Sequence, residues 1–322
     1  MLMAAFAAVS LLSCSKEDNV VVGESPIGFY CSDVWTKAMV SQESDMYNEG
    51  FQVYAHAEFD ESGEIFDFNK KVTYNLTDGW NYNNQKQEYW LPRCSYTFRA
   101  YYPSSLTSII DDQSAIKGFE ITPEYGEQQD ILMASASRTT AQTLTDGSAI
   151  NFNFQHILSN INVILKVDQV ERDGVDEDGN PIKEKVNAIE ADVKAVRLVG
   201  VARKADYING WVNHSGSASV GVNVSEAIPV TADGVSIFEN GLLAIPQTVN
   251  GDVSLYILAD ITLPTGTKMQ KQWNPTLPDR TWNANTKYNY TVKLTAEFNI
   301  EFEEPKVETW AQEQMSGTVV IR

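Results

Sequence analysis

The sequence predicts an all-β fold divided between two domains. Its apolar residues occur in short runs that alternate with polar residues and are broken by Gly, Asn, Asp and Pro, which is typical of strands joined by turns. After the N-terminal segment, no stretch of about 12 residues or more places apolar residues at helical spacing. The chain has 322 residues, more than one hydrophobic core supports, so two domains are expected.

The composition indicates a folded, acidic protein. Hydrophobic residues make up 43% of the chain, with 7 Trp, 14 Tyr and 13 Phe, which is enough to build substantial cores. The formal net charge is −19. Nucleic-acid-binding proteins need basic stripes and anionic membrane surfaces attract cationic ones, so we expect no nucleic-acid partner and no direct adhesion to anionic lipid.

The N-terminal segment resembles a bacterial lipoprotein signal peptide. Residues 1–12 are apolar apart from Ser10, and they are too few to span a membrane, which needs about 20. The next motif, Leu-Leu-Ser-Cys at 11–14, resembles a lipobox. The resemblance implies that residues 1–13 are removed, that Cys14 is acylated, and that 14–25 form a lipidated tether at the outer membrane. Cleavage by the ordinary signal peptidase, which leaves Cys14 unmodified, is the alternative.

Residues 26–147 are expected to form the first domain. Two of its runs place their larger apolar residues on one face: Phe51, Val53, Ala55 and Ala57 in the first, and Tyr96, Phe98, Ala100 and Tyr102 in the second. Pro103 ends the second run because proline cannot donate a ladder hydrogen bond. Residues 135–148 are rich in Ser, Thr, Ala and Gly without an apolar period, so we place the domain boundary at 147/148.

Residues 148–322 are expected to form the second domain. Its predicted strands lie at 150–154, 161–167, 193–199, 241–247, 253–261, 288–294 and 317–322. The segment 172–181 is acidic and rich in turn residues, which predicts the tip of a hairpin. Its oxygen-bearing side chains loosely resemble a calcium loop, but no Glu closes the loop and no helices flank it, so a solvated tip is the better interpretation.

No set of residues with the spacing of a catalytic or metal site is present. The three histidines, His56, His156 and His214, are far apart in sequence, and a structural hydrogen bond is the expected role of His156. Motifs of zinc proteases, serine hydrolases, phosphate-binding loops and paired cysteines are missing. We therefore expect no enzymatic activity, no catalytic residue, no metal and no cofactor.

Two features leave alternatives open. Cys31 and Cys94 could form a disulfide in an oxidising compartment or remain two buried thiols. The aromatic residues between Trp80 and Tyr102 could form a platform on which sugars stack, but most of them are expected to fill the first core, because aromatic residues suit strands and bury large areas.

Short motifs follow one another in order over nearly the whole chain. They are Ile27-Gly-Phe, Thr36-Lys-Ala, Phe51-Gln-Val-Tyr-Ala, Tyr89-Trp-Leu-Pro, Tyr96-Thr-Phe-Arg-Ala-Tyr-Tyr-Pro, Asp130-Ile-Leu-Met-Ala, Phe152-Asn-Phe-Gln-His-Ile-Leu-Ser-Asn-Ile, Leu243-Ala-Ile-Pro-Gln, WNANTKYNYTV at 282–292 and Val307-Glu-Thr-Trp. Each is weak alone, but the ordered set with the lipobox is similar to the fimbrillin family, the Mfa-like group of type V pilus lipoproteins.

The resemblance implies a fold, a location and a set of partners. The fold is two β-sandwich domains of transthyretin-like topology, and the location is the cell surface, anchored in the outer membrane or in fimbriae. The partners are other fimbrial subunits, joined by donor-strand exchange, in which another chain's strand completes a sheet. In polymerising members a protease cuts after an early Arg or Lys and removes the first strand.

The chain departs from that polymerising pattern. No Arg occurs between Cys14 and Arg93, and Lys37 is the best candidate for a maturation cut. An uncut chain keeps its lipid anchor and its filled groove, which favours an anchor, accessory or tip subunit over a stalk pilin. The strand at 317–322 would be the donor in a stalk subunit, or otherwise the last strand of its own sandwich. The alternative function is a surface adhesin that binds a host protein or a glycan without entering a polymer.

Overall fold

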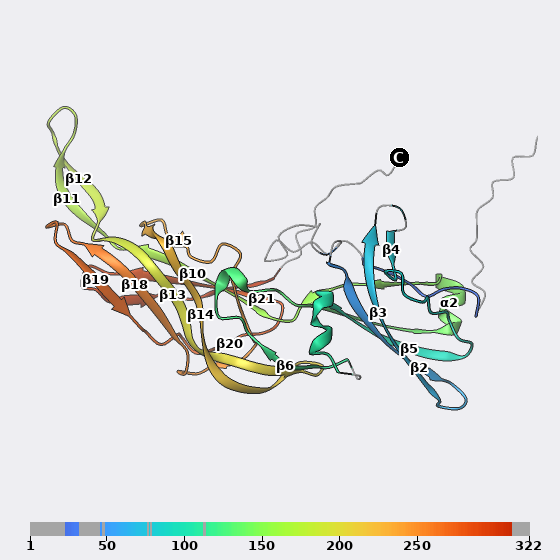
Figure 1. Cartoon of the computed structure of the whole chain (residues 1–322). Helices are drawn as coiled ribbons and strands as arrows, with labels where there is room; N and C mark the ends of the chain where they lie inside the picture. Colours follow the sequence, from blue (N-terminus) through green and yellow to red (C-terminus); the bar gives the residue numbers. More distant parts are fainter. Residues whose placement is uncertain are drawn as a thin grey trace, which may run out of the picture.

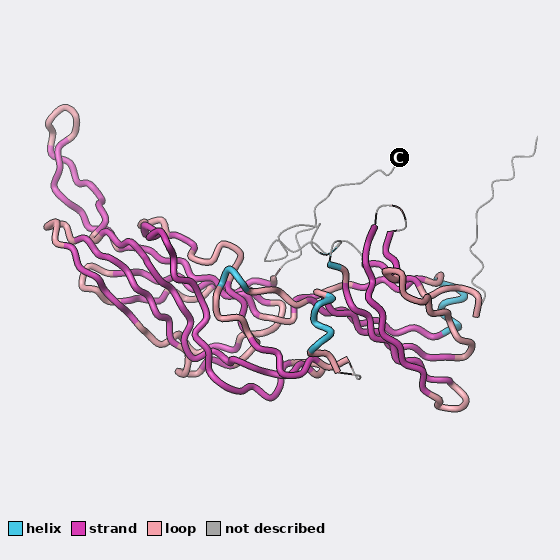
Figure 2. Tube along the Cα trace, viewed as in Figure 1, coloured by secondary structure: helices cyan, strands magenta, loops and turns pink. Residues whose placement is uncertain are grey.

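The computed structural model describes residues 23–31, 46, 49–75, 77, 79–111 and 114–310. The regular structure of the described part is almost all strand, in two bodies that lie end to end (Figures 1 and 2). The predicted all-β fold is confirmed. The strand expected at 317–322 lies outside the described residues. Among the described residues, no helix is long and apolar enough to cross a membrane.

The N-terminal body contains a six-stranded sheet and a two-stranded sheet. In order across the larger sheet, the strands are β4 (Gly79–Asn81), β3 (Ile65–Asn75), β2 (Phe51–Phe59), β5 (Cys94–Tyr102), β7 (Leu132–Thr139) and β9 (Gln155–His156). The smaller sheet pairs β1 (Gly28–Cys31) with β8 (Ala149–Phe152) in parallel.

The core of this body follows the predicted period of two. Phe51, Val53, Ala55 and Ala57 of β2 are buried, as are Tyr96, Phe98, Ala100 and Tyr102 of β5. Directly opposite residues include Val53 with Ala100 and Ala55 with Phe98, so the two apolar faces coincide. The alternation therefore predicted the buried face of both strands correctly, because one face of each packs into the core.

The C-terminal body contains two larger sheets and two smaller sheets of two strands each. One sheet joins β10 (Ser159–Val167) and β21 (Thr286–Leu294) with β15 (Val235–Ser236), β16 (Leu242–Ala244), β22 (Ile300–Phe302) and β23 (Lys306–Thr309). The other joins β13 (Glu190–Tyr207), β14 (Trp211–Val230), β18 (Ser254–Thr262), β19 (Lys268–Trp273) and β6 (Ile116–Glu120). The remaining pairs are β11 (Gln169–Val175) with β12 (Pro181–Asn187), and β17 (Thr248–Val249) with β20 (Arg280–Thr281). Side chains from both larger sheets form one continuous core.

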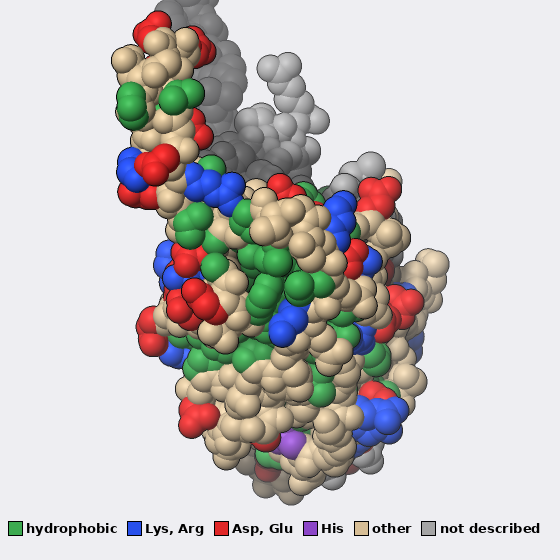
Figure 3. All heavy atoms as spheres, turned by 90° about the vertical axis from the view of Figure 1, so that its left-hand side faces the viewer, with side chains coloured by type: hydrophobic (Ala, Val, Ile, Leu, Met, Phe, Trp, Pro, Cys, Tyr) green, Lys and Arg blue, Asp and Glu red, His purple; other side chains and the backbone are tan. Residues whose placement is uncertain are grey.

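The β11–β12 hairpin projects from the far end of the C-terminal body (Figure 1). Figure 3 shows it rising above the rest of that end and carrying both acidic and basic side chains. At its tip, Asp176 accepts hydrogen bonds from the backbone of Asp178 and Asn180, at 3.0 and 2.7 Å. These bonds lower the pKa of Asp176, that from Asn180 most. The predicted hairpin tip is confirmed.

Short helical segments interrupt the described strands, among them η1 (Ser104–Ser108), η2 (Tyr125–Glu127) and α2 (Thr140–Asp146). The last lies inside 135–148, which we expected to be a connection, and β7 fills the first part of that segment. A capping box explains the helix start, because Thr139 and Gln142 satisfy each other's backbone N–H groups.

Strand pairing crosses the boundary expected at 147/148 in both directions. From the later side, β8 and β9 pair with β1 and β7 of the N-terminal body. From the earlier side, β6 pairs with β13 of the C-terminal body. Tyr101 of β5 is fully buried in the C-terminal core, and Arg99 donates to Asn209 at 2.5 Å, so the two bodies contact each other directly. The domain division itself stays a prediction.

Candidate functional site

The first strand, β1, is the element on which strand addition would act. It pairs in parallel with β8, in a register that runs from Gly28 opposite Ala149 to Cys31 opposite Phe152. Just before it, the chain is held by backbone bonds to the segment around Trp90. Ile27 N–H donates to Glu88 O at 2.8 Å, and Gly23 N–H donates to Trp90 O at 2.8 Å.

Alternate side chains of this segment enter the core. Ile27 is fully buried, and Phe29 is 5% exposed, whereas Tyr30 is 43% exposed. The Phe29 ring lies 5.7 Å, centroid to centroid, from each of three rings: Tyr82, Phe98 and Phe152. The first strand therefore fills an aromatic slot that the rest of the N-terminal body provides.

A buried phenol fixes the start of the strand. Tyr82 Oη donates to the carbonyl oxygen of Ile27 at 2.5 Å. Burial, together with the nearby Glu88 carboxylate, raises the pKa of Tyr82 well above its ordinary value of 10.0. The phenol therefore stays protonated and keeps its donor at any physiological pH.

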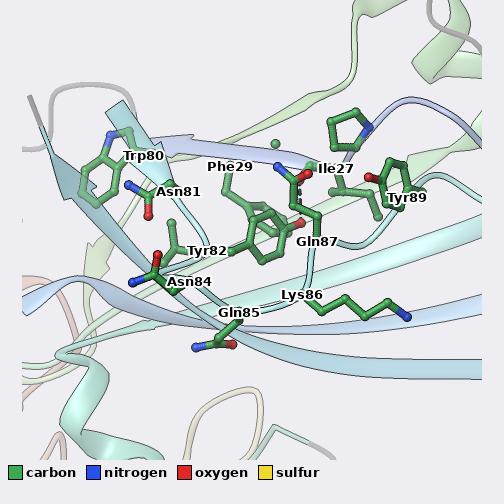
Figure 4. A pocket seen from close by; sticks show the side chains of 13 residues that line it. Ile27, Phe29, Trp80, Asn81, Tyr82, Asn84, Gln85, Lys86, Gln87 and Tyr89 are labelled. Atoms are coloured by element: carbon green, nitrogen blue, oxygen red, sulfur yellow. Dashed lines mark hydrogen bonds between the residues drawn. The ribbon is translucent and has the colours of Figure 1, made fainter. Parts of the chain in front are cut away.

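One edge of β1 borders a groove. Among the described residues β1 has a ladder with β8 alone, and its other edge faces a hollow of about 740 Å³ between β1, β4 and the segment that follows β4. Figure 4 shows this hollow, with Trp80 at one end, Tyr89 at the other and several amide side chains between them. The hollow is called the β1 groove below.

The two predicted modification sites, Cys14 and Lys37, lie outside the described residues and stay predictions. The position of Lys37 in the chain is nevertheless informative. β1 ends at Cys31 and β2 begins at Phe51. A cut after Lys37 would therefore separate β1 from the later strands that the structure describes, and it would fall inside none of these strands.

The structure has no disulfide between Cys31 and Cys94, but only one of the two thiols is fully buried, because Cys31 is half-buried. Cys94 is a fully buried free thiol, so it forms no disulfide with Cys31. Burial is the main cause that raises the pKa of Cys94 above its usual range, with the Asp60 carboxylate adding to it. A buried, protonated thiol behaves as a small apolar side chain.

The aromatic residues between 80 and 102 divide as expected. Six of the eight are buried: Tyr82, Trp90, Tyr96, Phe98, Tyr101 and Tyr102. Trp80 is half-buried against Phe51, with ring centroids 5.1 Å apart, and Tyr89 is 41% exposed. Most of the set forms the core, and three members, Trp80, Tyr82 and Tyr89, line the β1 groove.

The three histidines have separate partners. His156 is buried and bonds through Nδ1 to the buried carboxylate of Asp130, which confirms the structural hydrogen bond expected for it. The Trp310 ring stacks on its imidazole, with centroids 3.6 Å apart. His56 bonds to the exposed Asp67, and His214 to a backbone carbonyl. The described residues contain no group of three or more His, Cys, Asp or Glu that could hold a metal ion.

Sequence reasoning missed the amide side chains of the β1 groove. Asn81, Asn84, Gln85 and Gln87 line it, and no sequence motif had singled out any of the four. The available signal was the density of Asn and Gln between two aromatic residues, Trp80 and Tyr89, in a segment of low hydrophobicity. The sequence shows that these amides are close together in the chain, but only the fold shows which of the side chains share a face.

Comparison with known proteins is decisive for the family. The model of the family described as fimbrillin-like matches residues 36–310, which is most of the chain. The chain belongs to the fimbrillin-like family. A search of curated proteins finds no match.

Two solved structures show how widely this fold is shared. A fimbrial protein from Bacteroides vulgatus ATCC 8482 is 20% identical, with a TM-score of 0.62 over 89% of this chain and 99% of the other. A protein from Bacteroides uniformis ATCC 8492, provisionally assigned to cell adhesion, is 16% identical, with a TM-score of 0.51 over 86% of this chain and 97% of the other. At such identities the similarity demonstrates a common fold.

Proposed function

We propose that this fimbrillin-like protein is an anchor or accessory subunit of fimbriae, held in the outer membrane by lipid on Cys14 and joined to other subunits by strand addition. In this proposal the chain has no catalytic activity, and β1 remains in its slot unless a protease cuts after Lys37. The observation that carries the proposal is the way β1 is held: a four-residue strand with a ladder to β8 alone among the described strands, and a buried aromatic anchor, Phe29.

Such a strand is suited to replacement by a strand from another chain. Its affinity for the body comes from backbone ladder bonds and from Ile27 and Phe29, which enter the core at alternate positions. Any extended segment with apolar residues at the same spacing could make the same contacts. The slot left by β1 would expose the rings of Phe98 and Phe152, which creates a strong drive to refill it.

The N-terminus of the protein isolated from cells tests the proposal. Mass spectrometry is expected to find acylated Cys14 and an intact bond between Lys37 and Ala38. A free terminus at Ala38 would contradict the fixed anchor and indicate a stalk subunit. An unmodified Cys14 at a free terminus would contradict the lipid anchor.

Strand addition is tested on a variant with a specific protease site inserted between β1 and β2. After cleavage, a labelled peptide with the sequence of residues 24–31 is expected to bind the cut protein, and a peptide with Phe29→Ala is expected to bind far more weakly. Equal binding of the two peptides, or no binding to the cut protein, would contradict the strand-addition mechanism.

A second candidate function, an adhesin for a glycan or host protein, is favoured by one observation. Tyr89 is 41% exposed at the β1 groove and lies beside the polar amide side chains that line it, an arrangement on which a sugar ring could stack.

A further inference from the structure

The β1 groove has the size and the closed ends of a small-molecule site. Its volume of about 740 Å³ lies inside the range of about 300–1,000 Å³ that such sites span. Trp80 and Tyr89 close its two ends (Figure 4). Trp80 packs against Phe51 and Tyr74, at 5.1 and 5.4 Å between centroids, so this end of the groove is rigid.

Amide side chains supply the polar groups of the groove. No described residue hydrogen-bonds to the side chain of Asn84 or Gln87, so both amides are available to a ligand. Asn81 is held in place, because its Nδ2 donates to Gly79 O at 3.0 Å and its Oδ1 accepts from Asn83 N–H at 2.9 Å. Each amide offers two donors and an acceptor with two lone pairs, which matches the hydroxyl group, itself a donor and an acceptor.

The lining is almost without charge. It contains one charged side chain, Lys86, and no carboxylate, in a chain that carries 43 acidic residues and a net charge of −19. A groove with aromatic ends, amide walls and no carboxylate is not built for a cation. It suits a neutral ligand with many hydroxyl groups and an apolar face.

An extended peptide fits the groove less well. A strand added beside the residues that precede β1 would need their backbone groups, but those groups are already used or absent. Pro26 has no N–H, Ile27 N–H donates to Glu88 O, and Ile27 O accepts from Tyr82 Oη. Most polar side chains of the lining are amides, which recognise hydroxyl groups without requiring an extended backbone.

We propose that the β1 groove binds a neutral oligosaccharide of about disaccharide size. One sugar ring stacks its apolar C–H face on the exposed Tyr89 ring. The hydroxyl groups of the oligosaccharide hydrogen-bond to the side-chain amides of Gln87 and Asn84. This function is separate from strand addition, since it is a property of the intact chain in solution.

Saturation-transfer NMR on the purified, uncut full-length protein tests the proposal. The probes are cellobiose, lactose, maltose and chitobiose, with the anionic sialyllactose for comparison. At least one neutral disaccharide is expected to receive saturation, strongest at the C–H protons of one ring face. Tyr89→Ala and Gln87→Ala are each expected to weaken its affinity about tenfold, because each removes one stacking or hydrogen-bonding partner.

Tyr30→Ala is the matched control, because Tyr30 is as exposed as Tyr89 but does not line the groove. Its affinity is expected to equal that of the unmodified protein, and circular dichroism verifies that all three variants fold. The proposal is overturned if none of the neutral disaccharides receives saturation, if sialyllactose binds and the neutral sugars do not, or if Tyr89→Ala and Gln87→Ala leave the affinity unchanged. None of these results bears on the state of Cys14 or Lys37, so the proposed fimbrial role is tested separately.

Discussion

Replacing Phe29 with alanine measures how firmly the first strand is held. Phe29 is 5% exposed and its ring lies 5.7 Å from the rings of Tyr82, Phe98 and Phe152. Truncating a buried Phe costs about 3–5 kcal/mol, and the upper part of that range applies where the surroundings cannot collapse into the cavity. Three bulky rings fixed on three different segments leave little room for collapse. We therefore expect a loss of about 4 kcal/mol for the N-terminal body.

Urea unfolding followed by tryptophan fluorescence measures this loss. Trp90 is fully buried and its ring lies 6.0 Å from that of Phe98, so its emission reports on the same core. With an m-value of about 3 kcal/mol per molar urea, the midpoint of the N-terminal transition falls by more than about 1 M. Tyr30→Ala on the same strand, where the side chain is 43% exposed, is expected to change stability by less than about 0.5 kcal/mol.

Hydrogen exchange separates loss of β1 from loss of the whole body. The strand β8 pairs with β1, so detachment of β1 exposes its amides while β2 and β5 stay paired. If Phe29→Ala makes detachment of β1 about 4 kcal/mol easier, the backbone amides of β8 that become exposed should exchange several hundredfold faster. Equal midpoints for Phe29→Ala and Tyr30→Ala, or exchange that accelerates no more in β8 than in β5, would refute the view that Phe29 anchors the strand.

Three further predictions concern other buried groups. Asp130→Ala leaves His156 buried without its carboxylate partner, so urea unfolding is expected to show a loss of at least about 1–3 kcal/mol, and a loss below 0.5 would contradict the pairing. Gly241→Ala places a Cβ 1.8 Å from a buried amide oxygen at a φ of +81°, and it should lower the melting temperature well below that of Gly251→Ala, where φ is +90° but no atom lies within 4 Å. Burial raises the pKa of Tyr101 to about 12. The unfolded chain loses this proton first, so the stability contribution is complete below pH about 10 and falls as the pH rises to 12, which ultraviolet titration of the protein and of Tyr101→Phe would detect.

The alternation of side chains predicted the strands that have one buried face. Phe51 and Val53, or Phe98 and Ala100, face the core because a period of two follows directly from strand geometry. The same period of two places Tyr101 on the face of its strand opposite Phe98, and Tyr101 is fully buried as well. The C-terminal body packs over that face, and local periodicity carries no information about which distant segment will cover a strand.

Long-range pairing accounts for the other features that the sequence did not reveal. β6 and β13 are neighbours in the sheet although several other strands, β7 to β12, lie between them in the sequence. Their pairing runs from Glu120 opposite Lys204 to Ile116 opposite Tyr207. Short polar segments such as β6 have no pattern strong enough to specify a partner, so their place depends on the global fold. The β1 groove is of the same kind, because its walls come from two segments, around Ile27 and around Gln87, that the chain brings together only on folding.

The first strand links the two proposed activities, because the sugar site that we propose uses this strand's N-terminal end as one of its walls. Pro26 and Ile27 form one wall of the groove, and the Tyr82 phenol on the opposite wall is fixed by its bond to Ile27 O. A cut after Lys37 followed by departure of β1 would remove the first wall and release Tyr82 from its partner. Unless the incoming strand also supplied a carbonyl at the position of Ile27, the groove would lose its shape. A subunit that keeps β1 can therefore bind a sugar, whereas one that exchanges β1 becomes a link in a polymer. In such an assembly, ligand binding would belong to the uncut subunits, the class in which our proposal places this chain.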